Sequence, residues 1–179
     1  LEGRNEVPIR ALVRNALRMR PDRIIVGEVR GAECFDMLQA MNTGHSGSMT
    51  TVHANSARDA LTRIETTFLL AGIDIPLAAL RRQVASAVHV IVHLERMADG
   101  LRRVARITEV MGMEGDVITA QDIFDFKLER IARDNTVTGM LLPTGLVPKF
   151  NVAFEKRGIR LPRSVFGSSK TGRPGAPRE

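Results

Sequence analysis

The chain has 179 residues, enough for one domain with a substantial core. Its formal net charge of +6 suits phosphate ligands, nucleic acid or an anionic membrane face. All seven aromatic residues are Phe, so the chain has little with which to stack on bases, and single-stranded nucleic acid is a disfavoured partner. The single cysteine, Cys34, cannot form an internal disulfide, and no apolar run approaches the ~20 residues of a membrane helix. A reducing, cytoplasmic location is therefore expected.

Residues 8–20 show the apolar period of an amphipathic helix that begins at Pro8 and is ended by Pro21. One face of this helix carries three basic residues one turn apart, Arg10, Arg14 and Arg18. Like charges at this spacing repel one another. Either an acidic group offsets them, or the face is simply solvated.

Residues 22–55 have the pattern of a strand, a turn, a helix, a loop and a second strand. The first apolar run is followed by Gly27 and Glu28, and the second run ends at His53. A helical crossover between two strands predicts a parallel pair, and ligands of parallel sheets lie beyond the carboxyl ends of the strands. The pattern therefore predicts that Glu28 and His53 share one edge of the sheet. Either residue alone is more often an ordinary solvated or packed side chain, so it is the combination that favours a site.

Two segments of this stretch resemble motifs of a known family. The segment L-R-M-R-P-D-R-I-I-V-G-E-V-R-G, residues 17–31, resembles the Walker B region of secretion ATPases, the motors of type II and type IV secretion and of type IV pili. The segment T-G-H-S-G-S-M-T-T-V-H-A-N-S, residues 43–56, resembles their histidine box. The branch that the chain resembles most is that of the CpaF-like motors of the tight-adherence (Tad) pilus, from about Glu2 to Phe126.

The resemblance implies an α/β fold, a partial RecA-like P-loop NTPase core that lacks the Walker A strand and loop and carries an antiparallel strand extension. It also implies an ATPase that uses ATP and Mg²⁺ and assembles as a homo-oligomer, a hexameric ring. The motor would be cytoplasmic and peripheral to the inner membrane, where it meets the platform proteins of a pilus or secretion system.

The resemblance assigns roles to individual residues. Glu28 would be the catalytic residue, as general base or by positioning the attacking water. The residues that it places near Mg²⁺ and ATP are Gly27, Arg30 and Thr51. The residues of the histidine box, which would sense the γ-phosphate or couple subunits, are Gly44, His45 and His53. Arg4, at the end of a further family motif, would approach phosphates, in its own subunit or the next.

Two helices are predicted after His53, over residues 57–71 and 76–86, the first with a capping box formed by Ser56 and Asp59. Four arginines face outward on these helices: Arg58, Arg63, Arg81 and Arg82. In a ring of subunits they could reach the nucleotide of a neighbour, but each is expected to be an ordinary surface residue. From residue 88 the apolar period becomes two. The run 88–93 is predicted to be a central strand because it is apolar on both faces. On a strand, His89 and His93 lie too far apart for a metal site, so no direct metal ligation by the protein is expected beyond Mg–ATP.

Asp99-Gly100 predicts a tight hairpin between residues 88–93 and a partner strand at 101–111, and a further short strand is predicted at 117–126. Gly and Pro residues interrupt residues 135–150. The predicted organisation is the carboxyl-terminal part of a RecA-like ATPase domain over 1–130, an appendage over 131–166 and a disordered tail over 167–179.

The sequence contains no G-x-x-x-x-G-K-[ST] phosphate loop. Residues 167–171 have some of the right letters but are too short for the pattern. We expect the chain to be a fragment of a longer protein or the product of a truncated gene. Without the phosphate loop it should by itself bind ATP poorly and hydrolyse none. Two alternatives stay open at this point. One is a RecA-like nucleic-acid motor or binding domain, and the other is a degenerate, non-catalytic domain that only joins rings.

Overall fold

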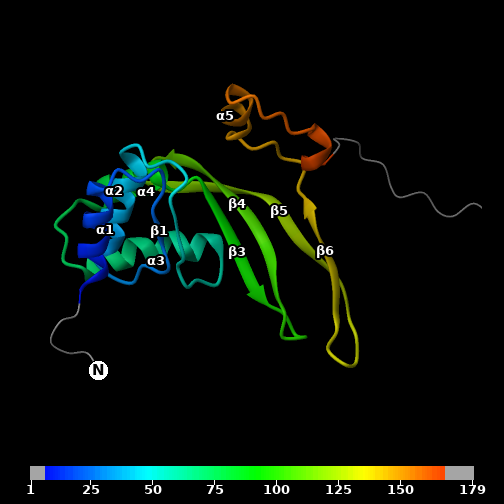
Figure 1. The fold of residues 1–179 in the computed structure, drawn as a ribbon. Coiled ribbons are helices and arrows are strands. Elements are labelled where there is room, and N and C mark those ends of the chain that lie inside the picture. The colour runs from blue at the N-terminus through cyan, green and yellow to red at the C-terminus, as the bar shows by residue number, and fades with distance from the viewer. Residues whose placement is uncertain (1–6, 168–179) are drawn as a thin grey trace, which may run out of the picture. The chain divides into compact units, whose positions relative to one another are not determined.

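The computed structural model describes residues 7–167, which form two compact units (Figure 1). The first unit comprises the described residues up to Ile91 together with Val110–Ala120, and the second comprises Val92–Glu109 together with those from Gln121 onward. The division between these units lies within the long strands, and the domain boundary near residue 130 stays a prediction. No helix in the described part is both long enough and apolar enough to cross a bilayer.

The described part of the first unit has a parallel strand pair with a helical crossover. Its helices are α1 (Ile9–Arg18), α2 (Glu33–Asn42), α3 (Ala57–Leu70) and α4 (Leu77–Ala87). Its strands β1 (Ile25–Val26) and β2 (Met49–Thr50) are parallel, with Ile25 opposite Met49 and Val26 opposite Thr50. Parallel neighbours cannot be joined by a tight turn, and α2 supplies the connection between them. The predicted strand–helix–strand arrangement is confirmed.

The core of the first unit is built around α2, which packs against α1, α3 and α4. The most deeply buried large side chains come from three of these helices: Met37, Phe68, Leu80 and Val84. The rings of Phe35 and Phe68 meet edge to face, with centroids 5.8 Å apart. This geometry is favourable for aromatic pairs beyond the apolar area that they bury.

Helix α3 begins at the predicted cap. The Ser56 hydroxyl accepts the N–H of Asp59 at 3.0 Å, and the Asp59 carboxylate accepts the N–H of Asn55 at 2.8 Å. The two side chains satisfy N–H groups at the helix start that would otherwise lack partners. Because the cap follows His53 by only three residues, the first turns of α3 must lie next to the end of the β2 segment.

The basic face of α1 is offset by an acidic residue of α2. Asp36 is 8% exposed, and its carboxylate lies 2.6 Å from Nε of Arg10 and 3.6 Å from Nε of Arg14. A buried carboxylate needs such partners, because an isolated one would be costly to desolvate. Of the two possibilities for this face, the structure selects the ion pair for Arg10 and Arg14.

Four long strands follow in the order β3 (Val90–Arg96), β4 (Arg102–Glu114), β5 (Val117–Ile131) and β6 (Val137–Pro143). They are joined by short turns into a meander (Figure 1), and the turn at Asp99-Gly100 is the predicted one. The prediction that residues 88–93 form a central strand is wrong, because β3 is at the edge of this sheet. Val90, Val92 and Leu94 are 40%, 49% and 58% exposed. Apolar residues on both faces of a strand indicate which faces can be covered by other residues. They do not indicate whether both edges of the strand are paired with neighbouring strands.

Strand β6 occupies a stretch that its Gly and Pro residues suggested was broken. It pairs antiparallel with β5, and Gly139 lies opposite Leu128. A Cβ at Gly139 would come within 2.6 Å of both the Lys127 carbonyl oxygen and the Phe126 ring. The glycine therefore permits a close approach of two strands instead of ending one, which is a recognised role of Gly within strands.

Asp99 connects the β3–β4 hairpin to β6. Its carboxylate accepts two N–H groups of Arg103, at 2.7 and 2.8 Å, and the backbone N–H of Val137 at 3.2 Å. The Arg103 guanidinium holds the pKa of Asp99 well below its usual range, with smaller contributions from backbone N–H groups of Leu101 and Val137. The side chain is thus ionised throughout the physiological range and keeps both elements together.

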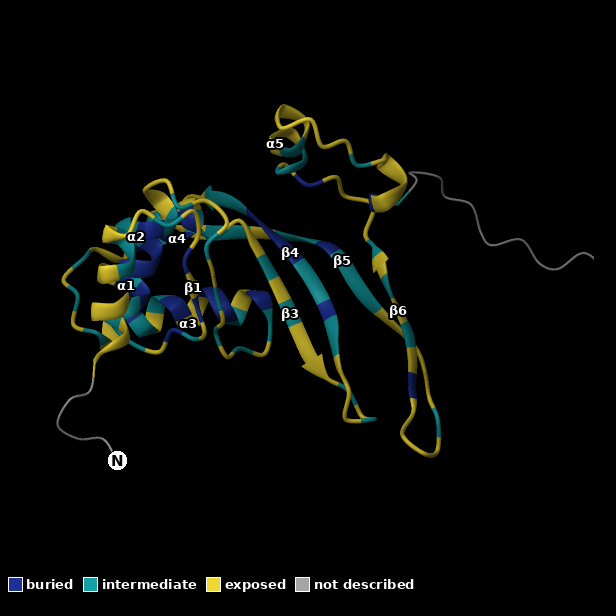
Figure 2. Ribbon diagram, viewed as in Figure 1, coloured by how far each residue is buried: buried dark blue, intermediate teal, exposed yellow. Residues whose placement is uncertain are grey.

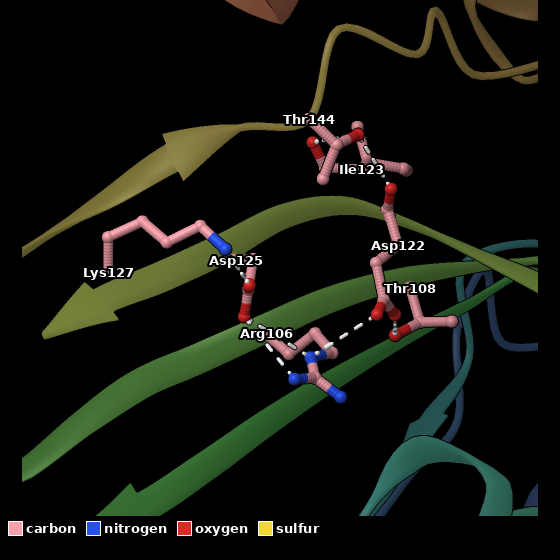
Figure 3. A network of polar contacts seen from close by, with 7 residues as sticks. All are labelled: Arg106, Thr108, Asp122, Ile123, Asp125, Lys127 and Thr144. Carbon is pink, nitrogen blue, oxygen red and sulfur yellow. Dashed lines mark hydrogen bonds and ion pairs between the residues drawn. The ribbon is translucent and has the colours of Figure 1, made fainter.

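A second polar network lies on β4 and β5 (Figure 3). Arg106 lies 3.3 Å from both Asp122 and Asp125, and Lys127 lies 2.7 Å from Asp125. At the end of β6, the Thr144 hydroxyl donates to the carbonyl of Asp122 at 2.7 Å, as Figure 3 also shows. The start of the following segment is therefore attached to β5.

The segment after β6 contains the short helix α5 (Asn151–Lys156) and the 3₁₀ turn η1 (Arg163–Phe166). Glu109, which is 3% exposed, accepts the backbone N–H groups of Lys149 and Phe150, each at 3.0 Å. At the other end of the segment, Phe166 is buried, and its ring centroid lies 6.2 Å from that of Phe124. Contacts at both ends therefore hold this segment on the sheet.

We expect the substitution Gly139→Val to destabilise the second unit by about 1–3 kcal/mol, the usual cost of forcing extra atoms into a filled space. Denaturant unfolding monitored by circular dichroism measures the change. The matched control is Thr138→Ala at the neighbouring exposed position, which we expect to have a much smaller effect. Equal stability of Gly139→Val and the parent chain would contradict the close approach.

Cys34 should be chemically inert in the folded chain. It is 3% exposed, and burial, together with the nearby charge of Glu33, raises the pKa of its thiol to about 12. Since the thiolate is the reactive form, we expect native protein at pH 8 to react with Ellman's reagent at least about 100-fold more slowly than protein in urea. An added cysteine at the exposed position Ser46 (Ser46→Cys) serves as the reactive control. Comparable rates for both cysteines in native protein would show that α2 does not bury Cys34.

Candidate functional site

The candidate site is at the carboxyl ends of β1 and β2. Beyond the paired strands, the Val29 N–H donates to the Thr51 carbonyl at 3.2 Å, and the Thr51 hydroxyl donates to the Gly27 carbonyl at 2.5 Å. These contacts keep the two segments side by side for several residues after the strands end. Glu28 and His53, which follow β1 and β2 in the chain, therefore reach the same edge of the pair.

Glu28 has a partner on each of its carboxylate oxygens. Its Oε1 lies 2.9 Å from Nε2 of His53, and its Oε2 lies 2.6 Å from a terminal guanidinium nitrogen of Arg30. The Glu28 side chain is 23% exposed, whereas those of Arg30 and His53 are 76% and 77% exposed. The carboxylate of Glu28 is therefore held by two nitrogen groups and is less exposed than the two side chains that hold it.

The surroundings favour the ionised form of Glu28. The hydrogen bond from Arg30 lowers the pKa of Glu28 most, partial burial opposes this, and the charges of Arg30, His53 and Arg63 lower the pKa further. In return, the hydrogen bond and charge of Glu28 raise the pKa of Arg30. The group thus combines one fixed carboxylate with an excess of positive charge around it, which suits an anionic ligand.

The side chains of Glu28, Arg30 and His53 line a cleft that runs along α3. The lining residues that follow β1 and β2 are Glu28, Val29, Arg30 and His53, and those of α3 include Asp59, Thr62, Arg63, Thr66, Thr67 and Leu70. Arg63, expected to be an ordinary surface residue, therefore faces the site. The signal that could have identified it is the short connection from His53 to the cap of α3, which forces the first two turns of that helix to lie beside the strand ends.

His45 is placed differently from His53. It precedes β2 while His53 follows it, and His45 does not line the cleft. Its carbonyl accepts the Ser48 hydroxyl at 2.8 Å, and the Ser48 oxygen accepts the N–H of Ile24 at 2.9 Å. Gly44, with φ +102°, turns the chain after α2 toward this position. The backbone of His45 thus supports the start of β1, and its Nδ1 is buried without a hydrogen-bond partner among the described residues.

The predicted residues near a nucleotide divide into three groups. Gly27 and Thr51 are joined by the hydrogen bond from the Thr51 hydroxyl to the Gly27 carbonyl, next to Glu28 in the chain, and Arg30 contacts the carboxylate itself. Arg4 lies outside the described residues. Because both oxygens of Glu28 already have nitrogen partners, this constellation fits a phosphate and an ordered water better than a metal bound directly by protein carboxylates.

The sequence of this chain is similar to those of proteins from bacterial secretion and conjugal transfer systems. Residues 1–131 match the family described as Type II/IV secretion system protein. A protein of Mycobacterium tuberculosis, assigned provisionally to conjugal transfer, is 52% identical over 117 residues, 65% of this chain and 33% of that protein. The type IV secretion system protein PtlH of Bordetella pertussis is 41% identical over 119 residues, 64% of this chain and 34% of PtlH.

The chain is also similar to a solved structure, that of the VirB11 ATPase from the Brucella suis type IV secretion system in complex with sulphate. The TM-score is 0.52 at 33% sequence identity, over 56% of this chain and 31% of the other. The α/β fold class is therefore shared with VirB11. The chain spans about a third of the length of the curated relatives that it matches.

The substitution Arg30→Met should raise the pKa of Glu28 toward its usual value of 4.5, because the largest contribution to the lowered pKa is removed. Carbon-13 NMR titration of labelled glutamate carboxyls measures the change. The lowered pKa contributes stability that is present above pH 4.5 and is lost as pH falls through the pKa of the folded state, so this acid-dependent loss should shrink in the variant.

The matched control is Arg133→Met, at an exposed arginine of the second unit that does not line the cleft. We expect it to leave the Glu28 titration unchanged. A Glu28 pKa that is the same in Arg30→Met and in the parent chain would rule out the ion pair in solution.

Proposed function

The chain belongs to the Type II/IV secretion system protein family, and we propose that it supplies the water-activating part of the nucleotide site in an ATP-driven motor of that family. The observation that carries this proposal is the contact between Glu28 and His53 at the carboxyl ends of two parallel strands. Oε1 of Glu28 lies 2.9 Å from Nε2 of His53, and both side chains line a cleft bordered by arginines. In open α/β sheets this edge is where ligands bind.

The proposed role of Glu28 is to position the attacking water. A general base works best when its pKa is near the working pH, whereas the surroundings of Glu28 lower its pKa. A carboxylate that stays ionised and is held by two partners is better suited to orient the attacking water than to accept a proton from it. In phosphoryl transfer such positioning is the main demand on the protein, because the transition state needs little covalent assistance.

The cationic residues around Glu28 would favour the negative charge that develops on the transferred phosphoryl group. Arg63 faces the cleft with no ion-pair partner within residues 7–167, so its guanidinium is free to approach a phosphate. His53 contacts Glu28 directly, which supports a role for this histidine in linking the state of the γ-phosphate to the catalytic carboxylate. When bound, ATP would bring Mg²⁺ to neutralise its phosphates, and the residues nearest to it would be Gly27, Arg30 and Thr51.

The rest of the motor belongs to the same proposal. The motifs favour the CpaF-like branch, and hence Tad or type IV-like pilus assembly, while the relatives described above are named for conjugal transfer and type IV secretion. A hexameric ring, a cytoplasmic location and contact with inner-membrane platform proteins are proposed with it. Gly44 and His45, at the other end of β2, would then couple subunits instead of touching the nucleotide of their own chain.

A chimera tests the proposal. The part of the M. tuberculosis relative that aligns with this chain, 117 residues at 52% identity, is replaced by the corresponding residues of this chain, and phosphate release is measured. We expect ATP hydrolysis by the chimera and a loss of at least about 100-fold in Glu28→Gln, which keeps the shape of the side chain but not its charge. The isolated 179-residue chain should show no turnover that depends on Glu28.

Glu95→Gln, at an exposed carboxylate of β3, is the matched control and should retain the activity of the chimera. Size-exclusion chromatography verifies that each chimera assembles. An assembled chimera whose turnover survives Glu28→Gln would refute the assignment of Glu28, and turnover by the isolated chain would refute the idea that it holds only part of the site.

A further inference from the structure

The basic character of the chain is confined to its end. Residues 1–143 contain 18 basic and 18 acidic side chains and are formally neutral. Residues 144–179 contain eight basic and two acidic side chains, so they account for the entire net charge of +6. A charge imbalance on this scale within a short segment is an electrostatic footprint for an anionic surface.

The described part of this segment exposes its cations. Between residues 146 and 165 there are five exposed basic residues and one acidic residue, Glu155, which accepts a hydrogen bond from Asn151 at 3.1 Å. The basic residues are Lys149, Lys156, Arg157, Arg160 and Arg163. The side chains of Arg160 and Arg163 have no ion-pair or hydrogen-bond partner within residues 7–167 and line a common cleft, together with Val147, Leu161 and Phe166.

Apolar side chains are exposed among these cations. Their exposed fractions are between 41% and 55%, and they are Leu146, Val147, Val152, Ile159 and Val165. In Figure 2 most of α5 and its flanking loops has the colour of exposed residues. Apolar residues interspersed with Lys and Arg characterise segments that lie on a bilayer, with the apolar groups entering the headgroup region and the cations meeting lipid phosphates.

The segment is also held in place. Thr144 is bonded to β5, the buried Glu109 accepts the N–H groups of residues 149 and 150, and Phe166 packs against Phe124. These anchors lie within the second unit, so the cations and apolar residues are displayed from an ordered support instead of an unstructured tail. A preordered surface loses less conformational entropy when it binds.

We propose that residues 144–167 form a binding surface for anionic phospholipid membranes, with Arg160 and Arg163 in contact with lipid headgroup phosphates. The exposed apolar side chains favour a bilayer over nucleic acid, because a nucleic-acid surface offers them nothing to enter. The absence of Tyr and Trp from the whole sequence counts in the same direction. In this proposal the chain contacts the membrane directly, in addition to the proposed contact with partner proteins. The surface does not include Glu28, so its binding to lipid does not depend on the nucleotide site.

Vesicle flotation with the full 179-residue chain tests the proposal, since bound protein rises with the vesicles while aggregated protein sinks. We expect binding to phosphatidylcholine vesicles that contain 30% phosphatidylglycerol, and at most weak binding to pure phosphatidylcholine. The double variant Arg160→Gln/Arg163→Gln should bind about 25-fold more weakly, at roughly five-fold for each cation removed near a membrane surface. Raising the salt concentration should weaken the binding of the parent chain.

Two further variants separate the surface from its net charge. Arg102→Gln/Arg130→Gln removes the same charge from exposed positions outside the segment and should bind as the parent chain does. Val152→Ser/Ile159→Ser keeps the charge but removes exposed apolar groups, and it should bind more weakly. Circular dichroism verifies that each variant is folded, which is expected because these side chains are exposed.

Other outcomes overturn the proposal. Equal weakening by the control pair would show that only the net charge matters, and no weakening in Val152→Ser/Ile159→Ser would show that the apolar residues do not enter a bilayer. Inorganic phosphate that abolishes flotation at millimolar concentration would identify a site for free phosphate. Tighter binding to duplex DNA than to the anionic vesicles would assign the surface to nucleic acid.

Discussion

The register of the parallel pair β1–β2 determines where the candidate site is. Two strands of only two residues each would not by themselves hold the loops that follow them. The pairing is extended by the Val29–Thr51 and Thr51–Gly27 hydrogen bonds, which involve the residues on either side of Glu28. A shift of one residue would turn Glu28 to the other face of the pair, because the side chains of extended chain alternate. The contact between Glu28 and His53 thus depends on hydrogen bonds in which neither of these two side chains takes part.

Buried or half-buried carboxylates join the elements in both units. Asp36 joins α2 to α1, Asp99 joins the β3–β4 hairpin to β6, and Glu109 joins the sheet to residues 149 and 150. Each carboxylate has at least two nitrogen partners, which compensates for its loss of solvation. Before residue 144, acidic and basic residues are equal in number, and Asp36 and Asp99 also contact arginines directly. The segment after β6 has no comparable supply of carboxylates, and its cations stay exposed.

Glu28 differs from these joining carboxylates in its accessibility. Its partners Arg30 and His53 are largely exposed, and the three side chains line a cleft instead of an interior joint. The side chains of Asp36 and Asp99 are 11% and 13% exposed, whereas the side chain of Glu28 is 23% exposed and lines the cleft. Accessibility, and not the type of interaction, therefore distinguishes Glu28 from the joining carboxylates and makes it the candidate for the functional carboxylate.

The sequence alone determined the elements that have strong local signals. The Ser56–Asp59 cap, the Asp99-Gly100 hairpin and the strand–helix–strand order around Glu28 follow from patterns that act within a few residues. The crossover pattern was enough to predict that Glu28 and His53 would lie at one edge. Local signals are sufficient there because the chirality and polarity of a strand–helix–strand unit leave few alternatives.

Only the tertiary structure decided the features that depend on distant neighbours. It placed β3 at the edge of its sheet, made Gly139 a point of close strand approach and not a break, and brought Arg63 to the cleft. It also separated His45 from His53, although one sequence motif contains both. The physical reason is the same in each case. Composition and periodicity report which face of an element is apolar, whereas its neighbours are chosen by packing between residues that are far apart in the chain.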